Sequence, residues 1–317
     1  MLDARLFTPL PREERRRIAD DYVAFALARD GDPDVRERRL SRREEFFRKL
    51  AERPAPEWRG ERIDREKFAR LHRGTIPPSE VSPLTFWLVQ VARANEGEGW
   101  GVDYLLDRGG FDGLGEGGRN LQPRDFADLE ETYHTRIMHE VCRLFGIEFQ
   151  MRTPPRVIQQ SVKIMAHLPR RASYMLLLAG ELMGTVAFAS MAQKGERLLA
   201  DHPEMRERVR ELFDEILVDE VGHVTFLLGS MNGWQLAVIR RLALAYSGAS
   251  RRGYDDAPPA DVALMQKGIR DYSLTLMPER VVRRAFVPEQ YWPDAYGPYP
   301  GAWWAAGGDP PARTALA

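Results

Sequence analysis

An all-α fold built on four core helices is predicted by two observations on this chain of 317 residues. Apolar residues recur at three- and four-residue spacing through long stretches, which is the periodicity of amphipathic helices. The alternating pattern of strands rich in β-branched residues is nearly absent. Further helical stretches precede and follow the four longest, so we expect a four-helix bundle with additional N- and C-terminal helices.

The composition is that of a soluble globular protein, with 44% hydrophobic and 29% charged residues. The net charge of -1 gives no general attraction for nucleic acid or for an anionic membrane. Cys142 is the single cysteine, which excludes an internal disulfide and thiol-rich metal sites. The most apolar stretch, 174–191, is interrupted by Glu181, so we expect a buried helix rather than a membrane span. No signal-peptide pattern opens the chain, and we expect a cytoplasmic protein.

Three sections are expected to form one compact domain. Residues 1–80 are an N-terminal helical extension, with helix at about 11–52 and a connection rich in Pro, Arg and Gly to about 80. Residues 81–230 are the bundle. Residues 231–317 hold two more helices, at about 234–246 and 259–285, and a tail rich in Pro, Tyr and Trp that packs over the body.

Proline and glycine set the boundaries of the core helices. Proline suits the first turn of a helix, because its missing N–H needs no partner there. Glycine suits the position just after a helix, as Gly146 and Gly195 do here. Pro169 must kink or interrupt the helix that opens at 153–155, and 108–118 is a glycine-rich loop. The four core helices are expected at about 83–106, 123–145, 170–194 and 204–228.

Two Glu-x-x-His motifs carry the chemistry. Among six histidines, only His134 and His223 follow a glutamate by three residues, namely Glu131 and Glu220. Residues three apart lie on one helix face, so each pair can reach the same metal ion. Both motifs lie on stripes of otherwise apolar residues, where a carboxylate is costly unless it is paired or binds metal.

Two further carboxylates complete the candidate set. Glu181 interrupts the apolar run LLLAGELMGTVAF and has no basic residue within one turn. In the first core helix, the apolar stripe includes position 98, so Glu98 is the first choice and Glu96 the alternative. One glutamate from each of two helices and a Glu-x-x-His from each of two others is the ligand set of carboxylate-bridged two-metal sites.

This ordered set resembles the ferritin-like di-iron carboxylate superfamily over about residues 84–229. That superfamily includes acyl carrier protein desaturases, bacterial multicomponent monooxygenases, ribonucleotide reductase small subunits, rubrerythrins and arylamine N-oxygenases. The resemblance implies a ferritin-like bundle, with Glu131 and Glu220 as bridging ligands. It also implies that Glu130 orients His223 and that Asp219 orients His134. An arylamine N-oxygenase has a further metal-binding histidine one turn before the second motif, where this chain has Ile216.

The function expected from this resemblance is that of an O2-dependent di-iron oxygenase or oxidase. Oxygen-rich ligation favours iron or manganese over zinc or copper, and both two irons and a mixed manganese–iron pair remain open. The expected substrate is a small organic molecule, which would be hydroxylated, N-oxygenated, desaturated or cleaved. An external electron donor, a ferredoxin or a flavin reductase, is expected as a partner, and a homodimer is left open. The alternatives are an iron-storing or peroxide-scavenging protein and a metal-free helical interaction protein.

Overall fold

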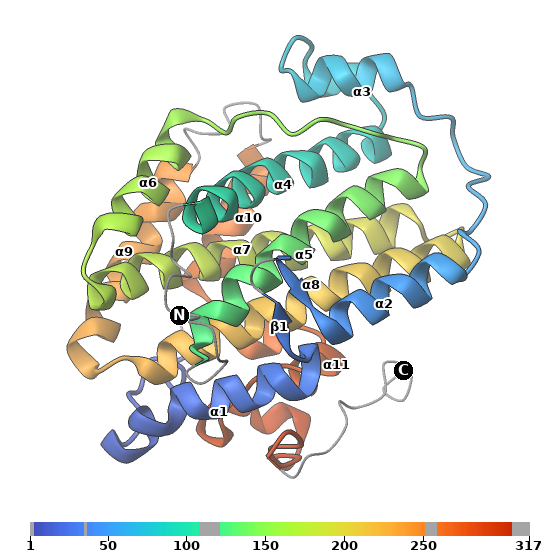
Figure 1. Cartoon of the computed structure of the whole chain (residues 1–317). Coiled ribbons are helices and arrows are strands. Elements are labelled where there is room, and N and C mark those ends of the chain that lie inside the picture. Colours follow the sequence, from blue (N-terminus) through green and yellow to red (C-terminus); the bar gives the residue numbers. More distant parts are fainter. Residues whose placement is uncertain (1–2, 35–36, 108–120, 251–258, 306–317) are drawn as a thin grey trace.

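The chain folds almost entirely into α-helices, which confirms the predicted fold class (Figure 1). The computed structural model describes residues 3–34, 37–107, 121–250 and 259–305. Within these ranges the one sheet is a two-residue hairpin, in which β1 (Pro33–Asp34) pairs antiparallel with β2 (Arg39–Leu40). The predicted loop at 108–118 lies outside the described residues.

Four long helices form the centre of the molecule. Their bounds lie within a few residues of those predicted, and they are α4 (Pro83–Asp107), α5 (Pro123–Leu144), α7 (Arg170–Leu198) and α8 (Pro203–Ser230). Each contacts two of the others, because α4 packs on α5 and α7, and α8 packs on α5 and α7. The interior between them is therefore lined by side chains from all four helices.

Local chemistry explains where α5 begins and ends. Pro123 occupies the first turn, and Gln122 and Asp125 form a reciprocal capping box with the backbone N–H groups. At the other end, Gly146 has φ of 69°, and its N–H donates to the Arg143 carbonyl at 2.9 Å. This left-handed conformation favours glycine, so Gly146 ends the helix as predicted.

The prediction that Gly195 ends α7 is wrong, since the helix continues to Leu198. Gly195 instead makes room for Trp87 of α4. A Cβ at position 195 would lie 2.7 Å from Cζ2 of the Trp87 ring. The indole Nε1 donates to the Met191 carbonyl at 2.9 Å, which holds the ring against α7. The glycine therefore serves close helix packing rather than termination.

The helical section expected at 11–52 consists of α1 (Arg12–Asp30) and α2 (Ser41–Glu52), which are separated where Gly31 has φ of 81° and the hairpin follows. The expected connection to residue 80 contains α3 (Arg65–His72) and the short 3-10 helix η1 (Pro78–Glu80). The α3 helix begins where the Asp64 side chain accepts the Lys67 N–H at 3.0 Å.

The C-terminal part also differs from a single long helix at 259–285. It divides into α10 (Pro259–Arg270), η3 (Leu274–Leu276) and α11 (Glu279–Val282), with Ser273 capping η3 and Pro278 immediately before α11. Pro169 separates α6 (Arg156–His167) from α7, and α9 (Gly233–Ser250) covers the predicted 234–246.

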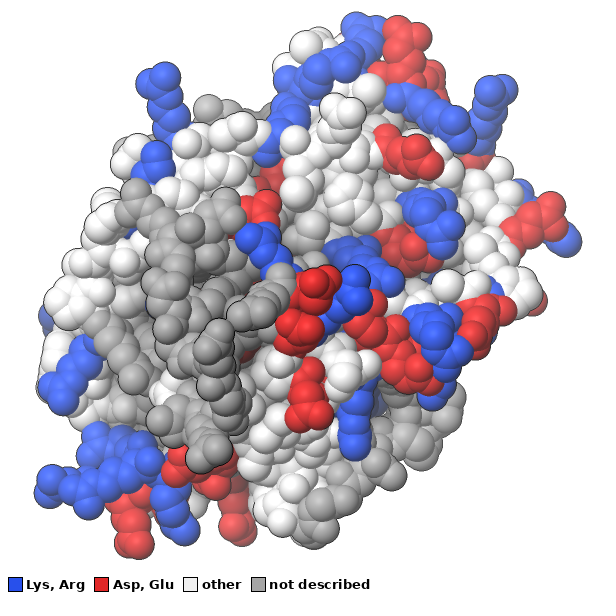
Figure 2. All heavy atoms as spheres, in the orientation of Figure 1, with Lys and Arg blue, Asp and Glu red and all other residues white. Residues whose placement is uncertain are grey.

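The aromatic tail packs on the body, as expected. After the 3-10 turns η4 (Glu289–Tyr291) and η5 (Asp294–Tyr296), Trp304 is buried with its ring centroid 5.3 Å from that of Phe25. On the face drawn in Figure 2, Lys and Arg are interspersed with Asp and Glu rather than gathered in one basic area.

Among the described residues, α7 is long and apolar enough to cross a membrane by length and composition. Of its most apolar window, 39% is buried, and the helix contacts α4, α6, α8, α9 and α10. The helix therefore packs on five other helices. The expectation that no membrane is involved stays a prediction.

The packing of Gly195 generates a stability test. Replacing a mid-helix glycine by alanine ordinarily stabilises a helix by about 0.5–1 kcal/mol. For Gly195→Ala we expect instead a loss of about 1–3 kcal/mol in the free energy of unfolding, because the new methyl group overlaps Trp87. Gly180→Ala on the same helix is the control, since no atom lies within 4 Å of its added Cβ. Denaturant unfolding measures both, and equal effects would contradict this account.

Candidate metal centre

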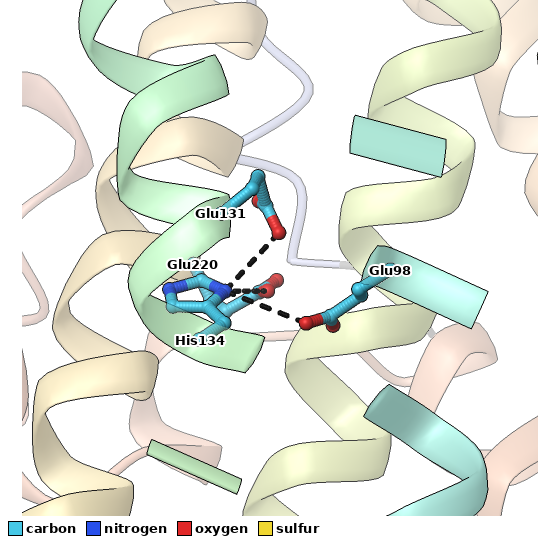
Figure 3. Close-up of side chains that lie close together, drawn as sticks. All are labelled: Glu98, Glu131, His134 and Glu220. Atoms are coloured by element: carbon cyan, nitrogen blue, oxygen red, sulfur yellow. Dashed lines mark ion pairs between the residues drawn. The ribbon is translucent and has the colours of Figure 1, made fainter. Parts of the chain in front are cut away.

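Six of the predicted donors converge between the four central helices. They form two groups that share Glu131, and in each group the donor atoms lie within 4.8 Å of one another. The first group is Glu98, Glu131, His134 and Glu220 (Figure 3), and the second is Glu131, Glu181 and His223. Each of the four helices contributes one carboxylate, and α5 and α8 each contribute one histidine.

The His134 ring is held with one nitrogen outward and one inward. Its Nε2 lies 3.0 Å from Asp219 Oδ2, outside the cluster. Its Nδ1 faces three carboxylates, at 3.2 Å from Glu131 and 3.7 Å from both Glu98 and Glu220 (Figure 3). With Nε2–H donating to Asp219, the Nδ1 lone pair points into the cluster, where it is available to a cation.

The His223 ring repeats this arrangement. Its Nε2 lies 2.7 Å from Glu130 Oε2, and its Nδ1 lies 3.3 Å from Glu181 and 3.4 Å from Glu131. The two outer carboxylates, Glu130 and Asp219, are therefore paired with the histidines as the resemblance implied. Each pair crosses between α5 and α8, so a hydrogen bond from one helix orients the histidine of the other.

Glu131 stands between the two groups. Its Oε2 is the oxygen near His134 Nδ1, and its Oε1 is the oxygen near His223 Nδ1. One carboxylate thus presents one oxygen to each inward-facing imidazole nitrogen. In this position, one carboxylate would be able to offer an oxygen to each of two cations.

The alternative donor Glu96 does not reach this site. Its Oε1 lies 2.7 Å from His72 Nε2 and 2.9 Å from Arg152 Nε. Burial alone would raise the pKa of Glu96, but the hydrogen bonds from His72 and Arg152 outweigh it and lower the pKa. Glu96 is two residues from Glu98 and so points to a different side of α4. The expectation that it might serve as the fourth donor is therefore wrong.

Outside the histidines lies a layer of arginines that the sequence did not reveal. Arg29 of α1 and Arg43 of α2 both donate to Asp219 Oδ1. Arg43 also pairs with Asp30 at 2.6 Å and with Glu215 at 3.0 Å. Asp30, Glu130 and Asp219 form a third acidic group, in which Arg29 and Arg43 pair with Asp30 and Asp219 and His223 pairs with Glu130. It is a supporting network rather than a further metal site.

Tyr22 holds Glu130, the outer carboxylate that faces His223. Its buried hydroxyl donates to Glu130 Oε2 at 2.9 Å, the same oxygen that faces His223. Arg284, near the C-terminus, donates to Glu215 in the same network. One sequence signal for these residues was the cluster of Asp214, Glu215, Asp219 and Glu220 on the buried helix α8. In the structure, Asp214, Glu215 and Asp219 are paired with arginines from outside the bundle.

Charge in the inner cluster is compensated differently. Among the described residues, the ion pairs of Glu98, Glu131, Glu181 and Glu220 are made with the two histidines and with no lysine or arginine. Burial and the neighbouring carboxylates raise the pKa of Glu220 well above its usual range, and burial raises the pKa of Glu181. Burial also raises the pKa of Glu98, to about 7. Only Glu131, between both imidazoles, has its pKa lowered, to about 2, against the effect of burial.

These residues fit a pair of metal ions. Glu98 Oε2 and His134 Nδ1 are buried atoms without a hydrogen-bond partner among the described residues, and both face the cluster. Four carboxylates and two imidazoles form a hard, oxygen-rich donor set suited to iron or manganese. Two divalent ions would balance the four carboxylate charges. Gly184 leaves room for one donor, since a Cβ there would lie 3.1 Å from Glu220 Oε2.

Thr185 and Phe188 of α7 and Tyr272 from outside the bundle border the site. The Thr185 hydroxyl lies 2.6 Å from the Glu181 carbonyl oxygen and 3.2 Å from Glu220 Oε2. Tyr272, which follows α10, is fully buried near these groups. Burial raises its pKa, and Glu220 and Glu181 raise it further. Phe188 packs beside His134, with ring centroids 6.2 Å apart, and helps to exclude water.

Comparison with protein-family models gave no match, and comparisons with curated proteins and with solved structures gave none either. The functional argument therefore rests on the geometry above.

The raised pKa values generate a prediction for the metal-free protein. The pKa of Glu98 is raised to about 7, and the carboxylates around His134 and His223 raise both histidine pKa values well above 6.5, against burial. Each of these groups binds a proton more tightly in the folded than in the unfolded chain, so its contribution is lost as pH rises through the folded pKa. The lowered pKa of Glu131 affects the stability of the fold only below about pH 5, where this carboxylate would become protonated in the unfolded chain. The Tm of chelator-treated protein should therefore fall from pH 5 to pH 8 in scanning calorimetry.

Glu98→Gln is the matched control for this experiment. A neutral amide has no charge to desolvate, so the variant should be more stable than the parent at pH 8 and its Tm should depend less on pH. A Tm that stays constant or rises from pH 5 to pH 8 in the parent would show that the inner carboxylates do not carry the unbalanced negative charge assigned to them.

Proposed function

We propose that the chain binds two iron ions, with a mixed manganese–iron pair as the alternative, in a ferritin-like four-helix bundle and acts as an O2-dependent oxygenase or oxidase on a small organic substrate. The observation that carries the proposal is the position of Glu131, which presents one oxygen to each inward-facing histidine nitrogen. The pairing of each histidine with an outer carboxylate adds support, because such hydrogen bonds orient metal-binding imidazoles.

Each donor has a distinct role in this proposal. Glu98 and Glu181 would be terminal ligands of the two ions, one on each side, and Glu131 would bridge them. Glu220 belongs to the first donor group and would be the second bridge, as the resemblance implies. Bound in the ferrous state, the two ions would supply the electrons that reduce O2.

The surrounding residues keep the donors in place. Asp219 and Glu130 hold the imidazole planes, and Arg29, Arg43 and Tyr22 hold those two carboxylates in turn. Thr185 fixes the position of Glu220 through its hydroxyl. Because these contacts are buried, the donors would need little rearrangement to receive metal, and bulk water would be kept from the reacting atoms.

The oxygenase proposal further requires a substrate cavity beside the metal ions, with a volume on the order of a few hundred Å³. Tyr272 lies near Glu181 and Glu220, which favours a cavity whose walls come partly from residues outside 84–229. Such an enzyme would take electrons from an external donor, a ferredoxin or a flavin reductase, and would work in the cytoplasm. The cavity and these partners stay predictions.

Metal stoichiometry tests the ligand set. Protein reconstituted anaerobically with ferrous iron should hold about two ions per chain, as expected for a site of this ligand composition. Glu181→Ala should lose much of that iron, because the second donor group keeps only Glu131 and His223. Elemental analysis after desalting measures the content, and unchanged iron in this variant would remove Glu181 from the set.

Glu98→Gln and Glu96→Gln form a matched pair on one helix for the same measurement. Glu98→Gln should bind less iron, whereas Glu96→Gln should keep the full content, because Glu96 is bonded to His72 and Arg152 instead. Equal losses in the two variants would mean that iron loss reports damage to α4 rather than removal of a donor. A metal-free interaction protein would bind no stoichiometric iron in any of them.

Oxygen consumption separates catalysis from storage. The reduced protein should consume about one O2 per pair of ions and then stop, because the site holds only two metals. An oxygen electrode and iron analysis on the same sample measure both quantities. Progressive loading of many iron atoms per chain in air would favour iron storage over the oxygenase.

A further inference from the structure

A cleft of about 630 Å³ lies between α3 and the segment that follows α5, away from the metal donors. In Figure 1 this segment runs past α3 and α4 toward α6. The volume is in the range of sites for small organic ligands. The lining residues include one acidic side chain, Glu148, and four arginines. The arginines are Arg65, Arg73, Arg143 and Arg152.

Two of these arginines already have carboxylate partners. Arg152 binds Glu96, and Arg143 binds Glu140 at 2.7 Å. Arg65 and Arg73 stand at the two ends of α3, and no carboxylate among the described residues pairs with either. The Arg65 guanidinium lies close to the turn at Gly146, since a Cβ there would lie 3.2 Å from Arg65 Nη2. It therefore reaches across to the opposite wall of the cleft.

Between the arginines the lining is aromatic. The His72 ring stacks on Phe68 with centroids 5.7 Å apart and meets Phe149 edge-on at the same distance. Phe149 in turn stacks on His139 at 4.3 Å. Phe68 and Ile147 are buried, so the base of the cleft is apolar while its rim carries positive charge.

We propose that this cleft binds an organic anion, with a carboxylate or phosphate group on a flat apolar body. Arg65 and Arg73 would pair with the acidic group, because guanidinium groups match the oxygens of carboxylate and phosphate in geometry. The apolar body would lie over Phe68, His72 and Phe149. This proposal is independent of the metal centre, because its residues contact none of the six donors.

Binding of 2-naphthoate to the full chain, measured by isothermal titration calorimetry, tests the proposal. The double variant Arg65→Gln/Arg73→Gln should bind it about tenfold more weakly or worse, since charge-assisted hydrogen bonds are lost. Arg70→Gln is the matched control, because Arg70 is exposed on the same helix but does not line the cleft. Circular dichroism should show all variants folded, as the substituted side chains are exposed.

Two further probes separate the charged from the apolar contribution. The neutral 2-naphthalenemethanol and inorganic phosphate should each bind more weakly than 2-naphthoate. No detectable binding of 2-naphthoate, or equal binding by the double variant and the parent, would overturn the site. Equal binding of the neutral alcohol would overturn the role of the arginines, and equal binding of phosphate would overturn the apolar part of the ligand class.

Discussion

The structure depends on one electrostatic constraint, which is that four carboxylates face one another between the central helices and, in the described part of the chain, form no ion pair with lysine or arginine. Each comes from a different helix, so their mutual repulsion acts directly on the packing of the bundle. Burial makes this repulsion stronger than it would be at the surface, because the interior screens charge poorly. Protons or metal ions must supply the missing positive charge, and the positions of His134 and His223 allow either.

The outer layer shows that the chain can neutralise buried acids with arginine where no cation site is formed. Asp219 accepts from Arg29 and Arg43, and Glu215 pairs with Arg43 and Arg284. Arg29 and Arg43 bind Oδ1 of Asp219, whereas His134 binds Oδ2, and among the described residues none of these arginines pairs with an inner carboxylate. The outer acids are thus neutralised by arginine side chains, whereas the inner four carboxylates pair only with the two histidines among the described residues. This separation is hard to explain as a requirement of folding alone, since an apolar interior would be less costly.

The central helices and the Glu-x-x-His motifs were predictable because both follow from local periodicity. Glu131 and His134 share a face whatever the rest of the chain does. The apolar stripe favoured Glu98 over Glu96, but the sequence could not exclude Glu96, because its partners His72 and Arg152 lie far away in the chain. The roles of Arg29 and Arg43 were not predicted for the same reason, because their partner Asp219 follows them by more than 170 residues.

The same long-range pairs explain why the chain extends beyond the bundle. Tyr22, Arg29 and Arg43 come from before the bundle and Arg284 from after it, yet all four hydrogen-bond to the carboxylates that support the two histidines or to their network. The extensions are therefore structural components of the site, and not appendages added to a self-sufficient bundle. This support favours the proposed enzyme over iron storage, because an outer shell of fixed partners limits how far each donor can move during repeated changes of charge.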